Sequence, residues 1–138
     1  MGESRQAKRR QIRLIRALAL TLALGIAAPA LAQEPPEAVY AKFHRAGLAA
    51  DYEGMRKYES AAKAKEMEPI PPEQREPMLE ALARTLPRSY SVVEKTVEEG
   101  ATRAVLRLRG TQPAISATIT LVKEKGEWKV DDANWGGR

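Results

Sequence analysis

The change of hydrophobic period near Pro87 constrains the fold of this chain more than any other feature. Before it, apolar residues recur every three or four positions, as they do along one face of an amphipathic helix. After it, apolar and polar residues alternate, which is typical of strands that bury one face. Helices followed by antiparallel strands make up an α+β domain. The sequence therefore predicts about three helices packed on an antiparallel sheet of about four strands.

Each expected helix has a recognisable start or end. Pro36 suits the first turn of a helix, where its missing N–H would have no partner. Asp51 is a good N-cap, and Pro87 cannot continue a helix. The three expected helices span residues 36–50, 51–62 and 72–86, with a proline-rich connector at residues 68–72 between the last two.

Short glycine-containing turns separate the expected strands. The strands are predicted at residues 89–97, 101–109, 114–123 and 127–135. Within them, every second residue is apolar over most of the length, so one face of the sheet is expected to be buried. The positions expected to face the helices are Ala104, Leu106, Leu108, Ile115, Ala117, Ile119, Leu121, Trp128 and Val130.

Residues 1–32 have the three parts of a secretory signal peptide: a basic stretch, an apolar stretch and a cleavage site. Ala30 and Ala32 form the A-x-A cleavage pattern, so we expect cleavage before Gln33 after Sec-type export. Residues 33–138 would then be a single mature domain, in the periplasm or outside the cell. The alternative is that the apolar stretch is retained as a membrane anchor, although it is short for a spanning helix.

The net charge of +5 comes entirely from residues 1–32, which carry six basic side chains and one acidic side chain. The rest of the chain carries equal numbers of both signs. Nucleic-acid binding needs a surplus of Lys and Arg, so we exclude nucleic acid as a partner of the mature domain. The chain has no Cys and one His, His44, which excludes disulfides, thiolate ligands and multi-histidine metal sites within one chain. We therefore expect no metal and no cofactor.

Two segments resemble the nuclear-transport-factor-2-like superfamily. Residues 36–60 (PEAVYAKFHRAGLAADYEGMRKYES) read as a long first helix, a break of small residues and then DYEGMRKY. Residues 119–130 (ITLVKEKGEWKV) read as a strand, a Glu-Lys-Gly turn and a second strand. Within that superfamily the chain looks most like exported bacterial domains of unknown function. The resemblance implies a cone-shaped, cystatin-like roll, in which the first helix lies across a strongly curved sheet and a pocket often opens between them. It says little about activity, because this fold serves many functions.

Aromatic and histidine side chains are the candidate ligand-binding residues of such a pocket. They are His44, Tyr40, Tyr58, Tyr90 and Trp135. A half-buried phenol can donate a hydrogen bond to a ligand, and His44 could act as a general base with an acid such as Asp51 or Glu53. The alternatives are tyrosines packed with their hydroxyls at the surface and a half-exposed helix histidine. No spaced acid–base pair is evident, so we assign no catalytic residue.

Arg103, Arg107 and Arg109 lie on one face of the second expected strand. Together with Lys95 they could bind an anion, such as a phospholipid head group or a glycan carboxylate. The alternative is an ordinary solvated face whose charges are paired across strands. The glutamates available for such pairs are Glu94, Glu98 and Glu124.

These features favour an exported, non-catalytic binding or interaction module of the cell envelope. Its expected partner is an unknown small ligand or an envelope protein, and only the signal peptide would enter the membrane. A homodimer through the sheet is expected by analogy with many such rolls. One alternative is a small cofactor-independent isomerase or hydrolase that uses His44 with a nearby carboxylate or Tyr. The other is a membrane-tethered protein that retains residues 1–32.

Overall fold

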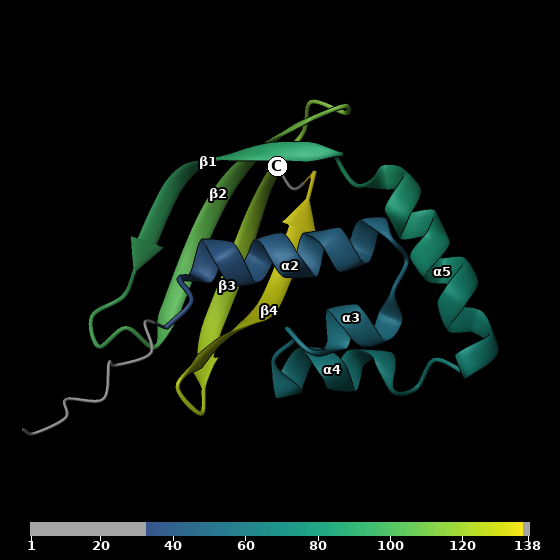
Figure 1. Ribbon diagram of the computed structural model, residues 1–138, viewed down its shortest axis with the longest axis horizontal. Coiled ribbons are helices and arrows are strands. Elements are labelled where there is room, and N and C mark those ends of the chain that lie inside the picture. The colour runs from purple at the N-terminus through teal and green to yellow at the C-terminus, as the bar shows by residue number, and fades with distance from the viewer. Residues whose placement is uncertain (1–32, 137–138) are drawn as a thin grey trace, which may run out of the picture. The chain divides into compact units, whose positions relative to one another are not determined.

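The computed structural model describes residues 33–136, which form four helices and one antiparallel sheet (Figure 1). The helices are α2 (Pro36–Leu48), α3 (Tyr52–Arg56), α4 (Ala61–Met67) and α5 (Pro72–Thr85), and the strands are β1 (Ser89–Val97), β2 (Arg103–Thr111), β3 (Ser116–Glu124) and β4 (Glu127–Trp135). The predicted α+β class is confirmed. The expected signal peptide, residues 1–32, lies outside the described residues.

The four strands form a meander in the order β1-β2-β3-β4, with every neighbouring pair antiparallel. The alternation read from the sequence is present in the burial of β2, where Ala104, Leu106 and Leu108 are buried and the arginines between and beside them are exposed. The same face continues through β3 to Trp128 and Val130 of β4. Ile115 was also expected on this face, but β3 begins one residue later and Ile115 is only partly buried.

The turn expected between the second and third strands, at residues 110–113, was placed too early, because Gly110 belongs to β2 and is buried. A β-carbon at Gly110 would collide with the Pro87 ring and would lie 3.0 Å from Trp135 Cζ3. The glycine therefore allows Pro87 and Trp135 to pack on the end of β2.

The single second helix expected at residues 51–62 is wrong, because the chain forms two short helices, α3 and α4, with a break between them. At the break, Ser60 N donates to Val130 O at 2.8 Å and Val130 N donates to Tyr58 O at 2.7 Å. These bonds attach the segment to the free edge of β4, and Ser60 then caps α4 by accepting from Lys63 N. Pairing with a strand thus overrides the local helical pattern.

The helices do not share the sheet equally. Helix α2 lies across the concave side of the sheet and packs on β4, and α4 also contacts β4 (Figure 1). Helix α5 packs mainly against α2 and α3, so the expectation that all three helical segments cover the sheet is corrected. None of the helices among residues 33–136 is long and apolar enough to cross a membrane.

Candidate ligand-binding pocket

A pocket of about 290 Å³ lies among α2, α3, α4, α5 and the end of β4. Most of its lining is apolar, and it includes the methionines Met55, Met67 and Met78. Methionine adapts its shape to irregular ligands because it is unbranched and has three rotatable bonds. Met78 is more than one-third exposed, so the pocket reaches the protein surface there.

A β-bulge directs the end of β4 into this pocket. Leu121 pairs with Val130 but Thr120 pairs with Asp132, so Asp131 is the extra residue in β4. In a regular strand the side chains alternate strictly, and the residues facing the helices after Val130 would be 132 and 134. The extra residue shifts this alternation by one position, which places Ala133 and Trp135 in the pocket lining instead.

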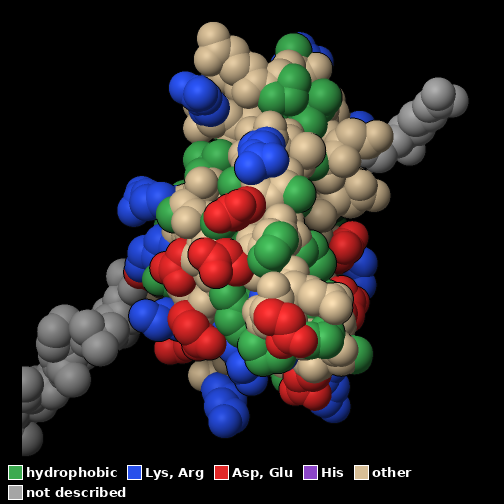
Figure 2. All heavy atoms as spheres, turned by 90° about the vertical axis from the view of Figure 1, so that its right-hand side faces the viewer, with side chains coloured by type: hydrophobic (Ala, Val, Ile, Leu, Met, Phe, Trp, Pro, Cys, Tyr) green, Lys and Arg blue, Asp and Glu red, His purple; other side chains and the backbone are tan. Residues whose placement is uncertain are grey.

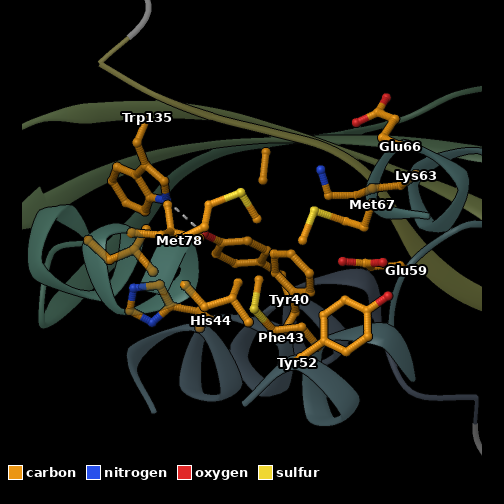
Figure 3. A pocket seen from close by; sticks show the side chains of 16 residues that line it. Tyr40, Phe43, His44, Tyr52, Glu59, Lys63, Glu66, Met67, Met78 and Trp135 are labelled. Carbon is orange, nitrogen blue, oxygen red and sulfur yellow. Dashed lines mark hydrogen bonds between the residues drawn. The ribbon is translucent and has the colours of Figure 1, made fainter. Parts of the chain in front are cut away.

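An aromatic cluster closes one end of the pocket (Figure 3). Trp135 Nε1 donates a hydrogen bond to Tyr40 Oη at 2.9 Å. The His44 and Tyr90 rings meet edge to face, with centroids 4.9 Å apart, and the Tyr40 and Tyr90 rings do the same at 5.4 Å. Rings in such pairs stabilise one another beyond the burial of their surfaces. The cluster therefore forms a preorganised wall.

His44 is only 5% exposed and stays neutral at pH 7, since burial lowers the pKa of its imidazole. It hydrogen-bonds the backbone of Pro87, which must be the carbonyl oxygen because proline has no N–H. Its Nε2 atom is buried and has no hydrogen-bond partner among the described residues. With Nδ1 as the donor to Pro87, the neutral ring presents Nε2 as an acceptor.

Glu59 is the second buried polar group of the pocket, at 9% exposure. Burial raises the pKa of its carboxyl, against the lowering effects of Lys63 and Arg56. Its Oε2 atom has no hydrogen-bond partner within residues 33–136. A buried carboxylate oxygen without a hydrogen-bond partner lowers the stability of the folded protein. Glu59 is therefore a candidate for a role in function rather than in stability.

Four of the five candidate ligand-binding residues come together in the structure. Tyr40, His44 and Trp135 line the pocket, and Tyr90 supports His44 from β1. Tyr58 is partly buried but does not line the pocket. Glu59 was not predicted from the sequence. It reaches the pocket because its neighbours pair with β4, and no sequence motif indicates that pairing.

No acid–base pair forms at His44 in the structure. Asp51 instead caps α3 by accepting from Gly54 N at 2.9 Å, and both Asp51 and Glu53 are exposed. Glu59 lies well away from His44, with the Tyr40 and Phe43 rings between them in Figure 3. Among the described residues, neither Asp51 nor Glu53 is therefore placed to form the expected acid–base pair with His44.

The three candidate anion-binding arginines lie on the outer face of β2, away from the pocket. Arg103 pairs with Glu98 at 3.3 Å and Arg107 with Glu94 at 3.4 Å. Lys95 does not join them, because it lies on the opposite face and pairs with Glu37 of α2 at 2.9 Å. Arg109 is exposed, and no ion pair to it occurs in the described part of the chain. The geometry matches a solvated face with cross-strand pairs.

Glu59→Gln is expected to stabilise the ligand-free protein at pH 7.5 but not at pH 4. The pKa of Glu59 is higher in the folded protein than its ordinary value of 4.5. The folded protein therefore binds a proton at Glu59 more tightly than the unfolded chain does. This tighter binding stabilises the fold at low pH, and the stabilisation is lost as the pH rises through the pKa of Glu59 in the folded protein. Gln carries no charge and has no such loss. Urea unfolding of both proteins at the two pH values measures the difference, and equal pH dependence would contradict it.

No known family model matches this chain, and no curated protein matches it either.

Proposed function

We propose that this chain is an exported, non-catalytic binding module of the cell envelope that holds a small apolar or amphipathic ligand in the pocket described above. The observation that carries the proposal is an open, largely apolar cavity with two buried polar atoms, His44 Nε2 and Glu59 Oε2, that have no partner in residues 33–136. Buried polar atoms are normally paired, and a few of them in an apolar pocket are typical of small-molecule sites.

Export to the periplasm or beyond rests on the signal-peptide pattern of residues 1–32. Membership of the nuclear-transport-factor-2-like superfamily is also part of the proposal. It is supported by the long first helix that lies across the sheet (Figure 1). It is also supported by the pocket that this helix helps to line. A homodimer through the outer face of the sheet remains a proposal of the same kind.

The binding proposal is tested by native mass spectrometry of the full chain, expressed in a bacterium and recovered from a cell-envelope extract. We expect a chain that begins at Gln33 and carries a displaceable, non-covalent adduct. Ala133→Leu fills the pocket and is expected to remove the adduct. Asn134→Leu makes a similar change on the next residue, which is exposed, and is expected to keep it.

Three results would count against this proposal. A bare mass for all three proteins, or an adduct that survives Ala133→Leu, would contradict binding in this pocket. A membrane-bound chain that still carries residues 1–32 would support the tethered alternative instead. Thermal unfolding of each variant shows whether a lost adduct reflects a filled pocket or a lost fold.

A further inference from the structure

The charged side chains of the pocket gather at one end of it. Figure 3 shows Glu59, Lys63 and Glu66 on one side, with His44 and Trp135 on the other and the Tyr40 ring between. The lining therefore carries two carboxylates against one ammonium, since His44 is neutral. No ion pair between Lys63 and Glu59 or Glu66 occurs within residues 33–136.

The surroundings of this end are also acidic. Residues 59–80 contain six glutamates and three basic residues, whereas residues 33–138 as a whole are neutral. Figure 2 views the molecule from the right-hand side of Figure 1, and acidic side chains gather on the lower part of the face that it shows. An excess of negative charge around one end of a pocket attracts cations to it and repels anions.

The aromatic end offers no charge to a ligand. His44 Nε2 is available to accept a hydrogen bond from a ligand. Tyr40 keeps its proton because burial raises the pKa of its phenol. An anionic group placed at this end would find no Lys or Arg among the described lining residues there, and it would face the lone pair of His44. A neutral hydrocarbon or hydroxyl fits this end without such a penalty.

Resting on the proposed binding function, we infer that the natural ligand is a small amine, whose ammonium group pairs with the buried Glu59 carboxylate and whose hydrocarbon lies along the methionine and aromatic lining. The volume of about 290 Å³ corresponds to about ten water molecules at about 30 Å³ each. That size suits an amine of few carbon atoms. The ammonium supplies the hydrogen bond that Glu59 Oε2 lacks, which explains the retention of a buried carboxylate here.

Three probes of equal chain length test the ligand class: hexylamine, hexan-1-ol and hexanoate. Calorimetric titration into the ligand-free protein, starting at Gln33, measures each dissociation constant at pH 7.5. We expect hexylamine to bind at least about tenfold more tightly than hexan-1-ol, as hydrogen bonds to charged groups imply. Hexanoate is expected to bind most weakly of the three.

Glu59→Gln tests whether the Glu59 carboxylate causes the preference for hexylamine. We expect the variant to bind hexylamine no more tightly than hexan-1-ol, with the affinity for hexan-1-ol changed less than twofold, a change of about 0.4 kcal/mol or less. Glu68→Gln is the matched control, because it removes the same charge from an exposed residue outside the pocket lining. It is expected to keep the preference for hexylamine.

The pH dependence of the wild-type protein gives a second test that needs no variant. Lowering the pH from 7.5 to 4 protonates the Glu59 carboxyl, because burial raises its pKa above the ordinary value of 4.5. The charged groups that also act on this carboxyl are Lys63, Arg56 and Glu66. The advantage of hexylamine is expected to fall as Glu59 loses its charge. Burial lowers the pKa of His44, so this imidazole resists the same acidification, and a proton gained there would disfavour the amine further.

The outcomes separate this inference from the proposed function. If none of the three probes binds, both are contradicted. If hexan-1-ol binds as tightly as hexylamine, or hexanoate binds most tightly, the pocket stands but the amine assignment is overturned. An unchanged preference in Glu59→Gln would also overturn it.

Discussion

Replacing Leu106 with Ala is expected to lower the free energy of unfolding by about 2–5 kcal/mol. Leu106 lies in the middle of β2, opposite Ile119 of β3, and both side chains are completely buried. Removing three carbon atoms at this position loses their transfer free energy and leaves a cavity, because neighbours on a hydrogen-bonded sheet can move little to fill it.

Val105→Ala is the matched control for this prediction. Val105 is the preceding residue of β2 and points to the opposite, outer face, where it is only partly buried. Its truncation is expected to change stability by about 0.5 kcal/mol. Urea unfolding of both variants measures the difference. Equal losses would show that the two faces of β2 do not differ in burial as described.

Replacing Trp135 with Ala is expected to destabilise the protein by about 2–4 kcal/mol, somewhat less than for a fully buried tryptophan. Its ring packs over Gly110, and the ring centroid lies 6.2 Å from those of both His44 and Tyr90. Its Nε1 atom donates a hydrogen bond to Tyr40 Oη. Its loss would remove one wall of the pocket and leave the Tyr40 hydroxyl without its partner. We therefore expect ligand binding to weaken together with stability.

Trp135→Phe separates the ring from its hydrogen bond. Phenylalanine keeps most of the aromatic packing but has no N–H, so the expected loss is about 1–2 kcal/mol. Adding Tyr40→Phe to this variant removes the acceptor as well, and the double variant is expected to lose less than the sum of the two single changes. Full additivity in chemical unfolding would show that the hydrogen bond between Trp135 and Tyr40 contributes nothing.

Periodicity alone predicted the strands and most of the core. The two strands at residues 89–97 and 127–135 begin and end where they were predicted. Leu106, Ile119 and Val130 are buried as expected, because side chains two residues apart on a strand must share a face. The start of α2 at Pro36 likewise follows from local chemistry.

Features that depend on contacts between distant segments could not be predicted in this way. The break between α3 and α4 exists because Tyr58 and Ser60 pair with Val130, which lies about 70 residues further along the chain. The bulge at Asp131 has no glycine or proline to mark it, and without it the alternation would place Trp135 on the wrong face. Glu59 becomes a pocket residue only through the same pairing. For these reasons the aromatic side of the site could be predicted but its carboxylate could not.

An open apolar pocket can be detected in solution by methionine-methyl NMR. Apart from Met1, the chain contains three methionines, Met55, Met67 and Met78, and all three line the pocket. Benzene is a suitable neutral probe because it enters apolar cavities without needing polar partners. In the ¹³C-methyl-labelled chain that starts at Gln33, we expect all three methyl signals to shift together and saturably as benzene is added, and Ala133→Leu to abolish the shifts. Three methyl signals that stay in place up to saturating benzene would contradict the account.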